Sequence, residues 1–550
     1  MKVFGVALPL LWATASIARP NGPSQAAFSA PRTWDSPPHP DATNHLVFNT
    51  VSSLLQRWQN TIYRNGHIIA AATIPAGTIL YHGRTNESVP TVPEWLAFDF
   101  EHAYIFCRGP CYVISLMATR DLRLAYFDGS SAAKMQTGPM DTQDVVIRDK
   151  PVPGRKFDER TRIAKLCEWG KPFGVDGFVR MEFHFEVMLC DFTAGMEVVT
   201  LLNLVPLDWH DMSHPGPKRP PREGDPSPAP PRRRPNFPRP ERPVGWKGSL
   251  PSARFRGIEA LIAGSWHNQA PGETRVRIDY SGIVTFYNPS LTSLVEARRG
   301  LRRPLHRLAE ISASDSARVH EELAEVFGRQ SKGSGIDWGS VTHVVIERYS
   351  ERLELLQYLL DPETYTNVTE RAAEVRIQIL TMLAPYITID AVPATASSSN
   401  TSWATSIVHY CSTTQTSLIP DGILTPQERL IRDAVEGTLH EICRRLTLMW
   451  IDAFDIEATP ERRKQEALGT WRFHVQELME WLDWPVWAQC HPACGTDAIC
   501  YVPSWPFFEE GDDPDDMTPR CVSRLRPGEP AEMQHLYQTS LSRDVGEVIG

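Results

Sequence analysis

The residues best suited to chemistry in this chain lie along one predicted strand, residues 177–189. Side chains alternate between the two faces of a strand, so Glu182, His184 and Glu186 share one face, opposite an apolar face. The flanking residues are strongly apolar, which favours a central strand with a partly enclosed polar face. An enclosed carboxylic acid has a raised pKa unless it is paired, as in many active sites. Two interpretations stay open: this face is exposed to solvent, or it lines a cleft.

The same polar face also suits a divalent metal ion. Alternate strand residues lie close enough to supply two ligands, and a third usually comes from another segment. The candidate ligands on and just after the strand are Glu182, His184, Glu186 and Asp191. His102 or His82 would supply the third. This set indicates metal-dependent hydrolysis as one candidate activity, although no His-Glu-x-x-His motif is present.

A second set of motifs surrounds this strand. Residues 80–84 read LYHGR, residues 95–99 read WLAFD, residues 101–104 read EHAY and residues 186–191 read EVMLCD. This ordered set resembles the ADP-ribosyltransferase fold of the His-Tyr-Glu type. That family places a histidine after its first core strand, an aromatic residue on a following helix and a glutamate at the start of a late strand.

The resemblance implies an NAD cofactor and a role for each matching residue. His82 would hydrogen-bond the adenosine-side ribose, and the backbone of Gly83 would read the nicotinamide amide, where a missing side chain permits close approach. Tyr104 would stack on the nicotinamide. Glu186 would bind the nicotinamide ribose and stabilise the positive charge that develops there. Arg84 departs from the family, which usually has Thr or Ser. The implied activity is ADP-ribosyl transfer or NAD hydrolysis.

The N-terminus predicts export. A charged start, an apolar run and small residues at its end describe a signal peptide over residues 1–18. The run is shorter than the roughly 20 apolar residues of a membrane span, and no later stretch is long and apolar enough. We therefore expect a secreted or lumenal protein without a membrane span in the mature chain. The Asn-x-Ser/Thr triplets at Asn86, Asn367 and Asn400 are candidate glycosylation sites.

The ten cysteines agree with an oxidising compartment, where disulfides are the default. They form even-numbered groups, so each group can close upon itself. The groups are Cys107, Cys111, Cys167 and Cys190; Cys411 and Cys443; and Cys490, Cys494, Cys500 and Cys521. Each group of four leaves three pairings open. A zinc site in the last group is the alternative, although that group lacks paired Cys-x2-Cys motifs.

Composition divides the chain, because 550 residues exceed what one core usually holds. Proline pairs, an arginine run and very few apolar residues predict a semi-rigid linker before residue 248, with basic residues that suit an acidic or SH3-type protein partner. The net charge of −10 argues against specific nucleic-acid binding. The predicted parts are a signal peptide (1–18), an α+β ADP-ribosyltransferase-like domain (45–205), the linker (206–247), a mainly helical domain (248–480), a disulfide-rich module (481–526) and a flexible tail (527–550).

Periodicity predicts elements within these parts. Before the linker we expect a helix over residues 51–63 and strands over 68–74, 78–81, 111–119, 122–127 and 177–189. After the linker we expect a short hairpin over residues 275–287 and helices over 341–360, 369–386 and 426–454. The last helix has a start signal, because Thr425 can cap it, Pro426 fits its first position and Glu428 completes a capping box.

Two classes of function follow from these patterns. One is an enzyme, either the NAD-dependent kind or the metal-dependent hydrolase. The other is a non-catalytic binding or structural protein that uses a transferase-like shell to hold a partner or a sugar. The whole chain is also similar to long secreted fungal proteins without an assigned activity, through residues 346–353 and its Cys-rich end.

Overall fold

The computed structural model describes residues 33–107, 110–155, 158–208, 243–329, 333–364, 366–391, 401–506 and 516–525. The predicted signal peptide, most of the predicted linker, the triplet at Asn400 and the predicted tail lie outside the described residues.

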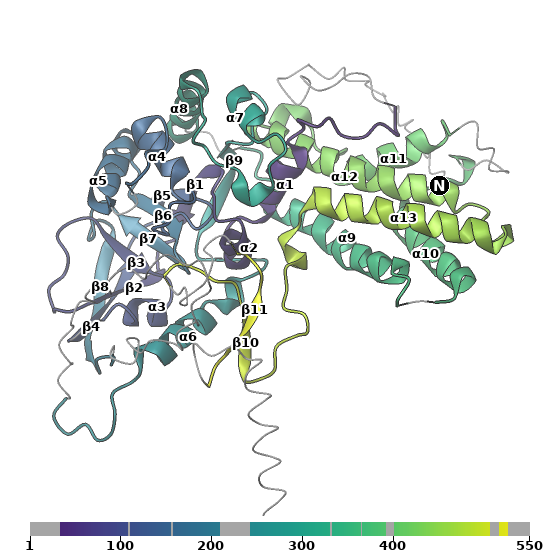
Figure 1. The fold of residues 1–550 in the computed structure, drawn as a ribbon. Coiled ribbons are helices and arrows are strands. Elements are labelled where there is room, and N and C mark those ends of the chain that lie inside the picture. Colours follow the sequence, from purple (N-terminus) through teal and green to yellow (C-terminus); the bar gives the residue numbers. More distant parts are fainter. Residues whose placement is uncertain are drawn as a thin grey trace, which may run out of the picture.

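A nine-stranded sheet organises the first half of the protein, with the strand order β8-β4-β2-β3-β7-β6-β5-β1-β9 (Figure 1). Neighbouring strands pair antiparallel except β5 and β6, which are parallel. The strands are β1 (Ile68–Ile74), β2 (Ile79–Arg84), β3 (Glu94–Ala97), β4 (Cys111–Ala118), β5 (Leu122–Phe127), β6 (Gly177–Met181), β7 (Phe185–Leu189), β8 (Met196–Leu204) and β9 (Arg277–Thr285). The last of these follows the predicted linker, so the sheet draws on both sides of it.

Helices cover both faces of this sheet. On one face, apolar side chains of the sheet pack against α4 (Asp141–Arg148), α5 (Glu159–Gly170), α7 (Thr292–Ala297) and α8 (Ala313–Gly328). The core of the other face continues without a break into a helical bundle, seen at the right of Figure 1. The bundle comprises α1 (Asn44–Ser52), α9 (Trp338–Leu360), α10 (Val368–Leu383), α11 (Ala404–Thr413), α12 (Pro426–Asp452) and α13 (Glu461–Leu482).

Three more helices complete this part of the protein. They are α2 (Arg57–Ile62), α3 (Phe100–Tyr104) and α6 (Ala253–Ala263). The small C-terminal module pairs β10 (Ala498–Tyr501) with β11 (Arg520–Ser523) and packs its Tyr501 and Val522 against Phe183 and Leu261. The segment after the predicted linker and the C-terminal module therefore both contact the first domain.

The predicted fold class is confirmed, because an α+β part is followed by a mainly helical region and a disulfide-rich end. The start signal of α12 is also confirmed. Thr425 accepts from the backbone N–H of Glu428, and the Glu428 side chain accepts from the backbone N–H of Thr425. Such a reciprocal cap depends only on nearby residues, which explains why the sequence was enough to predict it.

Three predicted elements are wrong. Residues 177–189 are not one strand but the antiparallel pair β6 and β7, with a tight turn over residues 182–184. Residues 275–287 are not a hairpin but contain the single strand β9, which pairs with β1. The helix expected over residues 51–63 is replaced by α1, which ends at Ser52, and by the separate helix α2. The pairing of β9 with β1 is a long-range contact, which the pattern within residues 275–287 does not reveal.

All ten cysteines form disulfides inside the three predicted groups. The pairs are Cys107–Cys111, Cys167–Cys190, Cys411–Cys443, Cys490–Cys500 and Cys494–Cys521. The alternative of a zinc ion in the last group is thereby excluded, since its sulfurs are bonded to one another. Asn86 and Asn367 are exposed. Among the described residues, no helix has the length and apolar character needed to cross a membrane.

Candidate metal centre

The predicted NAD-binding residues His82 and Tyr104 each hold a nearby backbone carbonyl. His82 lies on β2, is buried, and donates from Nδ1 to the carbonyl of Trp95 at 2.8 Å, while its ring contacts Phe192. Burial lowers the pKa of His82 to about 4. Tyr104 donates its hydroxyl to the carbonyl of Val205 at 2.6 Å. Both side chains therefore have structural partners.

The predicted catalytic residue Glu186 lies in a buried cluster of charges. Its carboxylate accepts from Arg180 at 2.7 Å, and the same Arg180 nitrogen donates to Glu159 at 2.7 Å. Glu182 accepts from Lys134 at 3.2 Å and from the indole of Trp505 at 3.0 Å. Burial raises the pKa of Glu182 against the attraction of Lys134. Glu182 and Glu186 are thus both buried and paired.

The strands that carry these residues are neighbours, but the side chains do not converge. Tyr81, Ala97 and Glu186 lie opposite one another across β2, β3 and β7, so they share a face of the sheet. His82 follows Tyr81 and leaves β2 on the other face. A Cβ atom on Gly83 would lie 1.9 Å from the carbonyl oxygen of Ala103, so α3 covers the backbone where the nicotinamide was expected.

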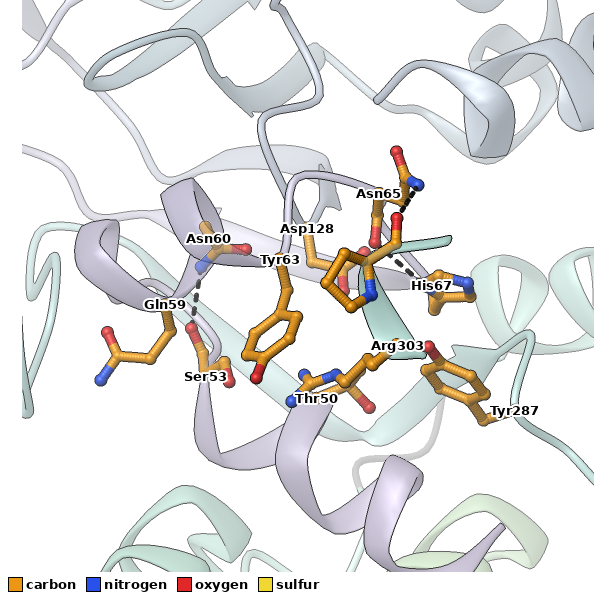
Figure 2. A pocket seen from close by; sticks show the side chains of 11 residues that line it. Thr50, Ser53, Gln59, Asn60, Tyr63, Asn65, His67, Asp128, Tyr287 and Arg303 are labelled. Carbon is orange, nitrogen blue, oxygen red and sulfur yellow. Dashed lines mark hydrogen bonds between the residues drawn. The ribbon is translucent and has the colours of Figure 1, made fainter. Parts of the chain in front are cut away.

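A polar pocket lies between the sheet and the bundle (Figure 2). Its wall includes His67, which donates to the carbonyl of Asn65 at 2.8 Å, and Arg303, whose guanidinium lies 3.6 Å from the centre of the Tyr63 ring. Asp128 also lines it. The cavity volume is ≈ 10 Å³, about the room that one water molecule needs. This pocket therefore suits a buried water and is too small for a substrate.

A different cluster has the composition of a metal site: Asp99, His184 and His267. One carboxylate oxygen of Asp99, Oδ2, lies 3.6 Å from Nδ1 of His184 and 3.6 Å from Nε2 of His267. The three candidate ligand atoms all lie within 4.8 Å of one another. A contact of 3.6 Å is too long for a hydrogen bond. It is close to the separation of about 3.4 Å between two ligands that hold one tetrahedral zinc ion at about 2.1 Å.

The imidazole nitrogens of this cluster lack hydrogen-bond partners among the described residues. His184 and His267 are fully buried, and neither ring nitrogen of either residue is bonded. Leaving a buried polar group unpaired costs about 1–3 kcal/mol. Burial, aided by Arg57, holds the pKa of His184 well below its ordinary value. A neutral imidazole is the form that binds a metal ion. An ion would therefore satisfy one nitrogen of each ring, Nδ1 of His184 and Nε2 of His267.

Asp99 is the residue before α3, and its carboxylate is oriented by a fixed arginine. Arg275 donates to Oδ1 of Asp99 at 3.1 Å and to the carbonyl of Phe98 at 2.7 Å. Glu273 holds the same guanidinium through contacts of 2.7 and 2.6 Å. Burial alone would raise the pKa of Asp99, but His184, His267 and Arg275 together hold it well below its usual range. The carboxylate thus presents Oδ2 to the histidines as an anion.

The two histidines are positioned by α2 and by a glycine. Arg57 donates to the carbonyl of Phe183 at 2.8 Å, beside His184, and to the Leu261 carbonyl at 3.1 Å on α6. A Cβ atom on Gly264 would lie 1.7 Å from Cε1 of His184. Only glycine therefore lets the His184 ring lie against the segment that carries His267, the last residue of the 3-10 turn Ser265–His267.

This arrangement can hold a zinc-type ion with one coordination position open. Two imidazoles and a carboxylate, with the fourth position free for water, form the ligand set of catalytic zinc sites. Asp99 is 11% exposed at its side chain. The ring centroid of Trp266 lies 5.1 Å from that of His267, and Trp266 is 48% exposed. The cluster therefore lies just beneath the surface on this side.

Sequence reasoning found one of these ligands and missed two. His184 was among the predicted metal ligands, whereas the structure brings neither Glu182 nor Glu186 into the ligand set, and Asp191 is exposed. Asp99 is the last residue of the WLAFD motif, to which the sequence assigned no ligand role. His267 lies far along the chain with no ligand spacing around it, and Gly264 three residues earlier is the only local sign.

Comparisons with known proteins show what the chain is similar to, but they give no information on its chemistry. Residues 41–113 and 108–212 match the family described as the YPL277C N-terminal domain. The chain is 26% identical to the uncharacterized protein YOR389W of Saccharomyces cerevisiae over 544 residues, covering 84% of this chain and 81% of the relative. It is 34% identical to the uncharacterized protein YPL277C of the same yeast over 210 residues, covering 29% and 43% respectively. No solved structure matches.

Proposed function

We propose that the protein is an exported metalloprotein that binds one zinc-type divalent ion through Asp99, His184 and His267. The observation that carries the proposal is a pair of buried imidazole rings that have no hydrogen-bond partner in the described part of the chain. One nitrogen of each ring lies 3.6 Å from the same carboxylate oxygen. The disulfides and the predicted signal peptide agree with export, where Asn86 and Asn367 would carry glycans. The reaction class that suits this ligand set is hydrolysis by a water at the open position.

The test measures metal binding by the full chain with its disulfides formed. After dialysis against a chelator, the wild-type protein should take up about one equivalent of zinc. Asp99→Asn and His267→Gln should lose this uptake. His306→Gln is the matched control, because His306 is also buried but its ring is bonded to Tyr287 and to the carbonyl of Leu301. A wild-type protein that retains no zinc at micromolar free zinc would overturn the proposal.

Activity is tested on the zinc-loaded protein with ester, peptide and phosphodiester probes. Hydrolysis that disappears in Asp99→Asn supports the hydrolase. Zinc binding without turnover of any probe would instead favour the non-catalytic alternative, in which the ion stabilises a protein that binds a partner.

ADP-ribosyl transfer stays a second proposal. The adjacency of β2, β3 and β7 is the observation in its favour, since the three strands would carry or lead to His82, Tyr104 and Glu186. Release of nicotinamide from NAD by the full chain, lost on Glu186→Gln, would support it. Turnover that survives this substitution, or no turnover at all, would count against it.

A further inference from the structure

A further buried histidine, His102, lies beside the proposed metal centre. It is the third residue of α3, three positions after Asp99, and is 1% exposed. Its ring stacks on Trp95 at 5.7 Å and contacts Phe183 at 4.4 Å and Phe106 at 5.8 Å. Neither of its ring nitrogens has a hydrogen-bond partner among the described residues. An aromatic enclosure cannot satisfy these nitrogens, so packing alone does not explain a histidine here.

The distance from His102 to the cluster suits an indirect contact with the ion. Its ring centroid lies 5.6 Å from that of His184, close to the 5.5 Å between His184 and His267. Yet its nitrogens are not in the set of atoms that lie within 4.8 Å of one another. Ligands on one tetrahedral ion are separated by about 3.4 Å. His102 is therefore too far to join the ligand set in this arrangement, but close enough for one water to lie between.

Resting on the proposed function, we infer that His102 accepts a hydrogen bond from a water at the open fourth position of the ion. A neutral imidazole has one nitrogen that accepts. His102 is then a positioning residue, which fixes the direction in which the water presents its lone pair to a substrate. Asp99 and His102 are three positions apart, so a single turn of the chain carries both a metal ligand and this hydrogen-bond acceptor.

The decisive variant is His102→Phe in the full chain. Phenylalanine suits the aromatic enclosure and removes both nitrogens, so the metal-free protein should be no less stable than the wild type. The dissociation constant for zinc should rise about tenfold, the lower end of the effect of partners that orient a metal site. Zinc should still bind with unchanged stoichiometry. His102→Gln, which restores an acceptor, should recover part of the affinity. His45→Phe is the matched control, since Nδ1 of His45 is also buried without a partner among the described residues, but its ring contacts Trp481.

The outcomes separate this inference from the proposed function. Equal zinc affinity of wild type and His102→Phe would overturn the inference and leave the metal centre standing. Complete loss of zinc in His102→Phe, with the metal-free fold intact, would also overturn it, because His102 would then be a direct ligand. Failure of the wild type to bind zinc would remove the proposed function and this inference together. If His102→Phe does not fold, comparing the zinc affinities of His102→Gln and His102→Leu tests the inference in the same way.

Discussion

Replacing Asp128 by asparagine should flatten the pH dependence of stability between about pH 4 and pH 7. Asp128 directly follows β5, is buried, and accepts a hydrogen bond of 2.7 Å from the backbone N–H of Ile68. Burial raises the pKa of Asp128 from 3.8 to about 7, even though hydrogen bonds from the backbone and the charge of Arg303 oppose the shift. The folded protein therefore keeps a proton at this carboxyl group over a pH range in which the unfolded chain has lost it.

The magnitude follows from the difference between the folded and unfolded pKa. One pKa unit corresponds to about 1.4 kcal/mol. A shift from 3.8 to about 7 therefore corresponds to up to about 4 kcal/mol. The pKa of Asp128 is higher in the folded protein than in the unfolded chain. The stabilisation of the fold by the protonated carboxyl group is therefore fully present below the unfolded pKa and is lost as the pH rises through the folded pKa. Asparagine stays neutral throughout and keeps an oxygen that accepts from the backbone N–H of Ile68. The free energy of unfolding of Asp128→Asn should therefore not fall in this way as the pH rises.

The assay is urea unfolding of the oxidised full chain, followed by tryptophan fluorescence at several pH values from 4.5 to 8. The informative quantity is the free energy of unfolding of Asp128→Asn minus that of the wild type, because other titrating groups cancel in this difference. The difference should grow in favour of the variant as the pH rises. Ser130→Ala, a buried non-ionisable neighbour, should give a pH-independent difference. A flat or falling difference for Asp128→Asn would refute the reasoning.

Two further predictions concern packing. Gly264→Ala should push the His184 ring aside and weaken zinc binding at least tenfold. Its control is Gly469→Ala, on an open face of α13, which should leave zinc binding unchanged and stabilise the protein by about 1 kcal/mol. Equal zinc affinities in the two variants would contradict the placement of Gly264. Removing the Cys411–Cys443 disulfide, which ties α11 to α12 across a separation of 32 residues, should lower the free energy of unfolding by about 2–4 kcal/mol in urea; an unchanged urea midpoint would show that helix packing alone holds α11.

Local signals in the sequence were enough for the parts of the fold that depend on near neighbours. The cap of α12 is set by Thr425 and Glu428, three residues apart, and both contacts form as expected. The even groups of cysteines close within themselves, and each bond joins cysteines no more than 32 residues apart in the chain. The broad fold class follows from the change of hydrophobic period along the chain.

The turn at residues 182–184 shows where local signals fail. Alternation of apolar and polar residues continues through it, and it contains no Gly, Pro, Asn or Asp to mark a turn. The two arms nevertheless pair, with Arg180 opposite Glu186, and the turn directs His184 away from the sheet towards Asp99. A one-strand interpretation therefore grouped His184 with Glu182 and Glu186, which the structure separates from it. The groups that His184 meets lie outside this turn: Asp99 and His102 at α3, and the segment after α6 that carries Gly264 and His267.

The proposed ion would also explain why the chain tolerates this costly cluster. None of the five disulfides joins the residues before 209 to those after 242. Asp99 and His184 lie before that segment and His267 lies after it, so an ion that holds all three closes a loop across it. Closing a loop restricts the unfolded chain, which stabilises the assembled form as a disulfide does. The unpaired nitrogens destabilise the metal-free fold. Bonds to the ion and loop closure offset that cost, but only when β9 and α6 are in place.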